Sequence, residues 1–238
     1  MTKLRISERM RTIESMVLSG KPLADVGTDH GLIPADLLMT GTVHFAVLTD
    51  INPGPLEKCR KNLSDLGLDP SLYEIRQGDG FEPLTGGGYG TVIAAGMGGE
   101  LITEFFEKMP SGPDGEGSCI AERFVLQPRT HEETLRSFLT QSCFKISDYA
   151  LAFEKGRICE VFAAEPCAAG ETAPDCGIIS SFLLEKGDPL LCDYVDNKIA
   201  SAESIIKSLK SSNSRQAAEQ RSLFEGTLAV LADIRKNL

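Results

Sequence analysis

Residues 25 to 31 are Asp-Val-Gly-Thr-Asp-His-Gly, and they belong to or directly follow an apolar run that starts at Pro22. A helix-like segment, residues 33–41, comes next. The heptapeptide therefore lies where a first strand meets a first crossover helix. In doubly wound sheets this junction is the crevice that receives a nucleotide, because glycines there let the backbone approach the ligand.

The spacing of the glycines narrows the kind of ligand. A dinucleotide-binding loop would have the pattern Gly-x-Gly-x-x-Gly, which residues 25–31 do not supply. Asp25, Gly27 and Gly31 form an acidic-x-Gly-x-x-x-Gly frame instead. This frame suits a loop that binds S-adenosylmethionine, in which no pyrophosphate has to be held.

Strand-like and helix-like segments alternate over the first two thirds of the chain. The strand-like runs are residues 22–27, 44–50, 73–79, 91–96 and 123–128, and the helix-like ones are 33–41, 53–67, 98–109 and 131–141. Such alternation predicts an α/β fold with a parallel sheet and right-handed crossovers. Two last runs, 146–154 and 158–165, flank a short Lys-Gly-Arg turn and predict an antiparallel hairpin at the end of the sheet.

Helical patterns of a different kind occupy the two ends of the chain. Apolar residues step by three or four from Ile6 to Val17, with Arg5 and Arg9 on another face, which predicts an amphipathic helix with a basic side. Similar stepping runs over residues 191–209 and 224–238, separated by a Ser-Ser-Asn-Ser break. We expect a domain over 1–165, a linker rich in Gly and Pro over 166–178, and a coiled-coil-like antiparallel helical hairpin over 179–238.

Composition places the protein among ordinary globular chains. Hydrophobic residues make up 42% and charged residues 24% of the 238 positions. No run of about 18 apolar residues occurs, and the first residues carry charge where a signal peptide would be apolar. We therefore expect a soluble, cytoplasmic protein without a membrane partner.

Cysteine and histidine patterns point away from a metal centre. The seven cysteines include no Cys-x-x-Cys pair, and the three histidines form no His-Glu-x-x-His motif. Reduced cytosolic thiols and no bound metal are the expectation.

The charge is unevenly distributed along the chain. A net charge of −10 argues against a nucleic-acid partner. Residues 1–21, however, hold five basic and two acidic residues, and residues 196–238 hold seven and five. The two ends therefore carry net charges of +3 and +2, and residues 22–195 between them carry a net charge of −15. The ends are basic and the middle is acidic.

Polar residues or glycines end three further strands of the predicted sheet. Asp50, followed by Ile51, ends the second strand at the position from which a carboxylate accepts hydrogen bonds from ribose hydroxyls. Its alternative is a structural turn, with Asn52 as a helix cap before Pro53. Asp79 and Gly80 follow the third strand, where the carboxylate could reach an adenine amine or simply form a turn. Gly96 and Met97 follow the fourth, where glycines open room for a substrate base.

These motifs, ADVGTDHG, TDINPGPLEKCRKN, GDG, AAGMGG and LQP in this order, resemble those of the bacterial tRNA adenine-N1 methyltransferases that modify position 22. The resemblance runs from the ISERMRTI helix to LLEKGDPLLCDYV and so covers nearly the whole chain. It implies a Rossmann-like class I methyltransferase with a seven-stranded, mostly parallel sheet. It also implies S-adenosylmethionine as cofactor, tRNA as partner held in part by the C-terminal hairpin, and a monomeric enzyme.

The resemblance also implies roles for single residues. It implies that the cofactor is bound by Gly27, Thr28, Asp29, Gly31, Asp50, Ile51, Asp79, Gly80, Gly96 and Met97. Asp29 and His30 are the catalytic candidates, and together with Gly96 and Met97 they would face the reacting base. The tRNA-binding candidates are Arg5, Arg9 and Arg11. Arg129, where the family has asparagine, and Cys159, where it has tyrosine, depart from the pattern.

Adenine N1 has an in-plane lone pair, so its attack on a methyl group needs no prior deprotonation. Positioning should supply most of the catalysis, and a carboxylate such as Asp29 could stabilise the cationic ring that forms. His30 could equally be a structural hydrogen-bonding residue of the turn. Two alternatives stay open: a methyltransferase of the same fold that acts on a small molecule, and a non-catalytic module that binds S-adenosylmethionine or RNA.

Overall fold

The chain divides into two units, Met1–Asp175 and Cys176–Leu238. The computed structural model describes residues 4–115, 118–168, 170–171, 175–210 and 214–238. The division falls inside the expected linker over 166–178, of which residues 169 and 172–174 lie outside the described residues. Most of the Ser-Ser-Asn-Ser break, residues 211–213, also lies outside them.

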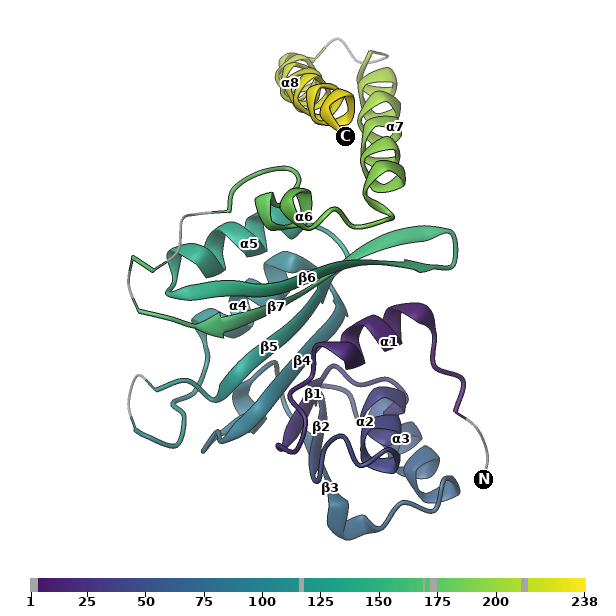
Figure 1. Ribbon diagram of the computed structural model, residues 1–238, viewed down its shortest axis with the longest axis vertical. Coiled ribbons are helices and arrows are strands. Elements are labelled where there is room, and N and C mark those ends of the chain that lie inside the picture. The colour runs from purple at the N-terminus through teal and green to yellow at the C-terminus, as the bar shows by residue number, and fades with distance from the viewer. Residues whose placement is uncertain (1–3, 116–117, 169, 172–174, 211–213) are drawn as a thin grey trace. The chain divides into compact units, whose positions relative to one another are not determined.

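A seven-stranded sheet forms the centre of the first unit. Its strands are β1 (Leu23–Val26), β2 (Ala46–Asp50), β3 (Tyr73–Gln77), β4 (Tyr89–Met97), β5 (Ala121–Pro128), β6 (Phe144–Glu154) and β7 (Arg157–Pro166). Their spatial order is β3-β2-β1-β4-β5-β7-β6 (Figure 1). Neighbouring strands are parallel from β3 to β5, and β7 is antiparallel to both β5 and β6. The Rossmann-like class I methyltransferase topology, with its closing antiparallel hairpin, is confirmed.

Helices cover both faces of this sheet. They are α1 (Glu8–Ser15), α2 (Leu32–Met39), α3 (Pro53–Asp65), α4 (Gly99–Glu107) and α5 (Glu132–Gln141), with 3-10 turns at Pro70–Leu72 and Glu82–Leu84. Alternate residues of a strand point to opposite faces, and β5 illustrates the result. Val125 belongs to the aliphatic core formed with Ile13 and Leu37, whereas Phe124 packs its ring 4.8 Å from that of Phe106 on α4.

The N-terminal helix α1 is shorter than the periodicity predicts. Ser7 caps it by accepting a hydrogen bond from the backbone N–H of Met10 at 3.3 Å, and the helix ends at Ser15. Ile6 and Val17, which the stepping pattern includes, therefore flank the helix.

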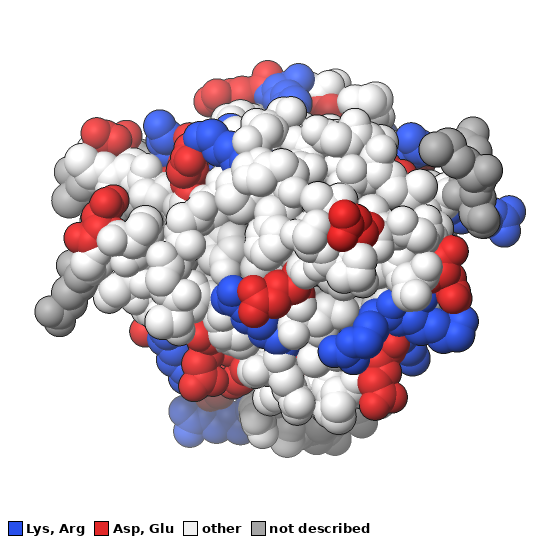
Figure 2. Space-filling view, turned by 90° about the horizontal axis from the view of Figure 1, so that it is seen from below, with Lys and Arg blue, Asp and Glu red and all other residues white. Residues whose placement is uncertain are grey.

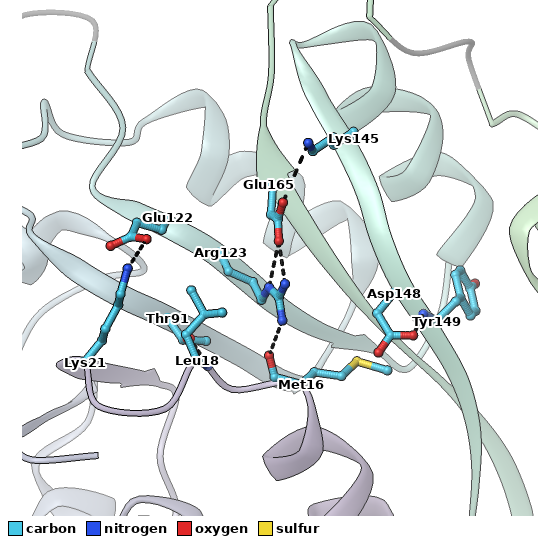
Figure 3. A network of polar contacts seen from close by, with 10 residues as sticks. All are labelled: Met16, Leu18, Lys21, Thr91, Glu122, Arg123, Lys145, Asp148, Tyr149 and Glu165. Atoms are coloured by element: carbon cyan, nitrogen blue, oxygen red, sulfur yellow. Dashed lines mark hydrogen bonds and ion pairs between the residues drawn. The ribbon is translucent and has the colours of Figure 1, made fainter. Parts of the chain in front are cut away.

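The segment after α1 is hydrogen-bonded to β4 and β5 near the starts of these strands (Figure 3). Arg123 donates to the backbone oxygen of Met16 at 3.0 Å and to Glu165 Oε1 at 2.9 and 2.6 Å. The backbone N–H of Leu18 donates to the hydroxyl of Thr91 at 3.0 Å. These contacts hold the chain just after the C-terminal end of α1 and so fix where the helix ends on the sheet.

The second unit contains α6 (Ser181–Lys186), α7 (Leu191–Leu209) and α8 (Arg215–Asn237). Arg235, near the end of α8, lies 2.7 Å from the carboxylate of Asp196, near the start of α7. The two long helices are therefore antiparallel, and they bury Ala202 and Ile206 of α7 and Leu231 of α8. The predicted helical hairpin is confirmed, and α8 begins nine residues before the apolar stepping resumes at Phe224.

The described residues contain neither a membrane-spanning helix nor a cluster of metal ligands. Among them, no helix has both the length and the apolar character needed to cross a bilayer. The same residues contain no cluster of three His, Cys, Asp or Glu side chains placed to hold a metal ion.

Candidate active site

The loop after β1 is pinned to the neighbouring strand. The backbone N–H groups of Gly27 and Thr28 both donate to the carbonyl of Thr49 on β2, at 2.8 and 3.0 Å. Gly31 then starts α2 with φ +63°, and a Cβ at this residue would meet the side chain of Leu48 at 2.9 Å. Only glycine fits there without moving the core, which explains the spacing of the motif.

A cavity of about 440 Å³ opens beside this loop. It is lined by Arg9, Met10, Asp25, Gly27, Thr28, Asp29, His30, Gly31, Leu32, Ile33, Ala95, Gly96, Glu154 and Lys155. Seven site residues predicted from the sequence, five in the loop after β1, Gly96 near the end of β4 and Arg9 of α1, thus line one cavity. Segments from both ends of the first unit complete its wall.

Asp25 is the most strongly perturbed acid of this cavity. Burial raises the pKa of its carboxyl to about 6, although the Thr28 hydroxyl and the charge of Arg9 act in the opposite direction. The sequence places Asp25 in the motif, but its role as a buried, cavity-lining acid was not predicted. The sequence did contain a signal for this role, because Asp25 lies inside an apolar strand, where an acidic residue is unusual unless it has a function.

Asp29 and His30, the two catalytic candidates, point into more open surroundings. The Asp29 carboxylate lies 3.3 Å from Lys58 Nζ and 3.1 Å from His30 Nε2. About half of the His30 side chain is exposed, and its backbone oxygen accepts a hydrogen bond from Asn62 at 3.1 Å. Lys58 of α3 is therefore an electrostatic partner of Asp29.

Asp50 and Ile51 end β2 outside the lining of this cavity. Asp50 Oδ1 accepts a hydrogen bond from the backbone N–H of Asn52 at 2.7 Å, which leaves Oδ2 for another donor. Asn52 is the residue before α3, and Pro53 is its first residue, as predicted, but the Asn52 side chain makes no capping hydrogen bond. Ile51 is 56% exposed and offers an apolar surface beside the carboxylate.

Asp79 and Gly80 belong to a separate cavity of about 230 Å³. A Cβ at Gly80 would lie 2.3 Å from the ring of Phe105, so the close packing of this ring requires glycine. Phe81 and Lys108 also line the cavity. The sequence-predicted adenine contact therefore has an aromatic and partly enclosed setting.

Gly96 and Met97 end β4, where its register with β5 shifts between Ala95 and Met97. Gly96 has φ +80°, and a Cβ there would meet nothing within 4 Å, so this glycine leaves open space. The Met97 sulfur lies 3.2 Å from where a Cβ of Gly27 would be. Met97 thus packs against the loop after β1, and its place beside a substrate base stays a prediction.

A second cavity, of about 600 Å³, adjoins the first. It shares Arg9, Asp29, Gly96, Glu154 and Lys155 with the first, and its other lining residues are Gln127, Pro128, Arg129, Glu132, Arg157, Ile158 and Cys159. Both departures from the family pattern, Arg129 and Cys159, therefore line the same cavity. The strand-end sequence alone could not show this, because the two residues come from different strands.

Arg9 joins α1 to the sheet at the border of the two cavities. Its Nε lies 2.7 Å from Glu154 Oε2, its Nη1 donates to Gln127 Oε1 at 3.1 Å, and Ser7 donates to Glu154 Oε1 at 2.5 Å. We expected Arg9 on an open basic face of the helix, but it occupies a partly buried ion pair because α1 lies across the sheet. Arg5 and Arg11 line a different surface cavity, of about 510 Å³.

Charges elsewhere on the surface are mixed. The face drawn in Figure 2 carries basic and acidic side chains next to one another, with wide uncharged areas between them. Among the residues coloured there, no broad surface of one sign is visible.

The arrangement suits group transfer between two bound molecules. One cavity is bordered by a glycine loop and a buried acid, the other by polar and basic side chains, and Asp29 and Gly96 lie where they meet. Ligands of open α/β sheets bind at this carboxyl edge of the strands.

Comparisons with known proteins agree with this geometry. A family model described as a methyltransferase domain matches residues 6–162. The tRNA (adenine(22)-N(1))-methyltransferase of Bacillus subtilis is 30% identical over 165 residues, which cover 69% of this chain and 67% of the relative.

Two solved structures extend the likeness to nearly the whole chain. A candidate tRNA (m1A22) methyltransferase of Streptococcus pneumoniae, in complex with S-adenosyl-L-methionine, has a TM-score of 0.80 at 26% identity and covers 97% of this chain and 100% of its own. The B. subtilis enzyme TrmK, at 23% identity, shares the fold with a TM-score of 0.80 over 98% of this chain and 100% of its own. The chain belongs to the methyltransferase-domain family and, within it, to the tRNA (adenine(22)-N(1))-methyltransferases.

Proposed function

We propose that this protein transfers the methyl group of S-adenosylmethionine to N1 of adenine 22 in tRNA, as a cytoplasmic monomer. The observation that carries the proposal is the pair of adjoining cavities with Asp29 and Gly96 at their border. One cavity suits the methyl donor and the other suits the acceptor base. A single transfer centre needs this arrangement, because the two reacting atoms must come within about 3–3.5 Å of each other.

The residues of the first cavity fit the cofactor. When bound, S-adenosylmethionine supplies an electrophilic methyl group on a sulfonium cation. Gly27 and Gly31 let the loop pack closely against Met97 and Leu48, and the open space beside Gly96 leaves room for a ligand. Asp25 and Asp29 provide carboxylates on a wall that faces a cationic ligand. In this proposal Asp50 holds the ribose through its free oxygen, and Asp79 reaches the adenine amine.

The second cavity would hold the acceptor base. Adenine N1 carries its own lone pair, so this chain has no proton to remove before transfer. The task of the protein is orientation, which can be worth roughly 7 to 11 kcal/mol. The ring becomes cationic as the bond forms, and the Asp29 carboxylate at the border of the cavities stabilises that charge. Lys58 and His30 fix the orientation of this carboxylate.

A base inside a folded tRNA must leave its stack to reach this site. Turning it out costs a few kcal/mol, which contacts to the neighbouring backbone must supply. Arg5 and Arg11 of the N-terminal segment and the basic residues of the α7–α8 hairpin are the proposed contacts, because residues 1–21 and 196–238 carry the surplus of positive charge.

Methyl transfer from labelled S-adenosylmethionine to unmodified total tRNA tests the proposal. We expect 1-methyladenosine in the nucleoside digest of a tRNA with adenine at position 22, and none from the same transcript with guanine there. Label in both transcripts, or in neither, would contradict the assignment. Label found only in a small-molecule fraction would favour the alternative methyltransferase.

A further inference from the structure

Three basic residues surround the mouth of the second cavity from two structural elements. Arg129 follows β5, and its backbone N–H donates to the carbonyl of Met97 at 2.7 Å, which holds it beside the end of β4. Lys155 belongs to the turn between β6 and β7, and Arg157 is the first residue of β7 after it. This turn lies above α1 in Figure 1. All three line the same cavity.

The turn that carries two of these cations is geometrically well defined. Glu154 and Arg157 pair in register across the hairpin, so the loop consists of Lys155 and Gly156 alone. Both loop residues have positive φ, at +50° and +80°, as in the tight turns that match the twist of two antiparallel strands. Lys155 and Arg157 are therefore presented by a short, fixed support.

Arg129 and Arg157 line the second cavity together with Cys159. Burial raises the pKa of the Cys159 thiol above its ordinary value, while the charges of Arg9, Arg129 and Arg157 act in the opposite direction and that of Glu154 adds to the rise. Arg129, which follows β5, and Arg157, the first residue of β7, thus line a common cavity although they come from distant parts of the chain.

Within the described part of the chain, the side chains of Arg129, Lys155 and Arg157 form no ion pair. The acids of the same cavity have other partners. Glu154 is paired with Arg9, Asp29 is paired with Lys58, and Glu132 has a polar or electrostatic interaction of its own. Three cations without an ion pair at one cavity stand out in a central region, residues 22–195, that carries a charge of −15.

We propose that Arg129, Lys155 and Arg157 bind the backbone phosphates on either side of the nucleotide whose base enters the second cavity. The inference deepens the proposed function and rests on it. Phosphate contacts fix the register of a nucleic acid on a protein without reading its sequence, and arginine suits phosphate because its planar fork can donate two parallel hydrogen bonds. These contacts would hold the target nucleotide out of its stack.

The test uses full-length variants in which the three residues are changed to glutamine, singly and together. We expect the triple variant to raise KM for unmodified tRNA about tenfold or more at moderate salt, with a smaller effect on kcat, since phosphate contacts are made before and during transfer alike. The slope of log affinity against log salt should fall by about 0.7 to 0.9 for each phosphate that the variant no longer neutralises. Affinity for S-adenosylmethionine should stay within about twofold in Arg129→Gln and Arg157→Gln, because neither residue lines the first cavity, whereas Lys155 does.

Lys145→Gln is the matched control. Lys145 lies near the other end of β6 from Lys155, about 30 Å away along the strand, and is about half exposed beside Glu165. This substitution removes one positive charge, as each single variant does, but Lys145 does not line the cavity. KM and the salt slope should therefore remain those of the wild type. Thermal melting of every variant separates loss of binding from loss of fold, and the single variants replace the triple one if it unfolds.

The outcomes keep the two proposals apart. Failure of the proposed function shows in the wild type, as absence of 1-methyladenosine in any tRNA. Filter binding of tRNA to the wild type and the triple variant still tests the phosphate contacts in that case. A folded triple variant whose tRNA affinity and salt slope equal those of Lys145→Gln would overturn the phosphate assignment.

Discussion

The Arg9 guanidinium lies 2.7 Å from the Glu154 carboxylate, and this ion pair joins two residues 145 positions apart at the border of both cavities. Both side chains are about one-fifth exposed. Burial raises the pKa of Glu154, but the hydrogen bonds from Ser7 and Arg9 outweigh it and hold the pKa below its ordinary value. The pair therefore stabilises α1 on the sheet and shapes the site at once.

Arg9→Ala should destabilise the fold by roughly 1–3 kcal/mol at pH 7, because it leaves a partly buried carboxylate with fewer donors. A carboxyl whose folded pKa is lowered contributes stability above its unfolded pKa of about 4.3 and loses it as pH falls through the folded value. The stability difference from wild type should therefore shrink below about pH 4. Urea unfolding at pH 7 and pH 3.5 measures it, and a difference that stays constant would contradict the ion-pair account.

Asp25→Asn should stabilise the ligand-free protein at neutral pH while weakening S-adenosylmethionine binding. The folded pKa of about 6 lies above the ordinary value of 3.8, so the wild type loses stability as pH rises from about 4 to 6. Two pKa units correspond to a cost on the order of 3 kcal/mol.

The asparagine variant should lack this pH-dependent loss. Melting curves at pH 4 and pH 7.5 give the comparison, and calorimetry gives the affinity. Equal melting temperatures of variant and wild type at both values would show that the carboxyl is not strained by burial.

Asp50→Ala should weaken S-adenosylmethionine binding and leave the fold intact. Each hydrogen bond to the charged carboxylate that the change removes is worth about 1.5 to 3 kcal/mol. Calorimetry measures the affinity. Asp69→Ala, which removes a comparable turn carboxylate that accepts from Ser71, serves as control. Unchanged affinity in Asp50→Ala would exclude a ribose contact.

Asp29→Asn should lower turnover more than cofactor affinity. The change keeps the shape of the side chain and removes the charge that faces the developing cation, and it also releases Lys58. Single-turnover rates and calorimetry on the same preparation separate the two effects. A loss of affinity as large as the loss of rate would make Asp29 a binding residue only.

Truncation after residue 190 should spare S-adenosylmethionine binding and abolish tRNA methylation at ordinary concentrations. Every proposed cofactor contact lies in Met1–Asp175, whereas α7 and α8 belong to the other unit. Circular dichroism checks that the shortened chain is folded. A truncated protein that methylates tRNA with undiminished efficiency would refute this division of labour and favour a small-molecule substrate.

The mostly parallel sheet with its closing hairpin, and the glycine loop, were predictable because their determinants are local. Apolar runs of strand length alternate with helical periodicity, and right-handed crossovers leave few topologies for such a pattern. Gly27 and Gly31 are required by the backbone at their own positions, where φ is +72° and +63°. The carboxyl edge of a parallel sheet then brings residues after β1 and β4 together whatever the side chains between them.

The side chains that complete the site were decided by packing between distant segments. Periodicity gave Arg9 a solvent-facing position, but α1 lies on β6, so the residue pairs with Glu154. Met97 ends β4, and only the folded structure shows that its sulfur lies 3.2 Å from where a Cβ of Gly27 would be. Arg129 and Cys159 were separate departures in the sequence, and only the antiparallel return of β7 beside β5 makes them neighbours in one cavity.

The sequence by itself therefore determined the class of the fold and the glycine loop at the carboxyl edge of the sheet, because backbone requirements and hydrophobic periodicity are encoded over short stretches. Only the tertiary structure decided which charges remain uncompensated, how α1 closes the site and which acid is buried. Those properties depend on distances between segments that are far apart in the chain, and burial and charge pairing follow from those distances.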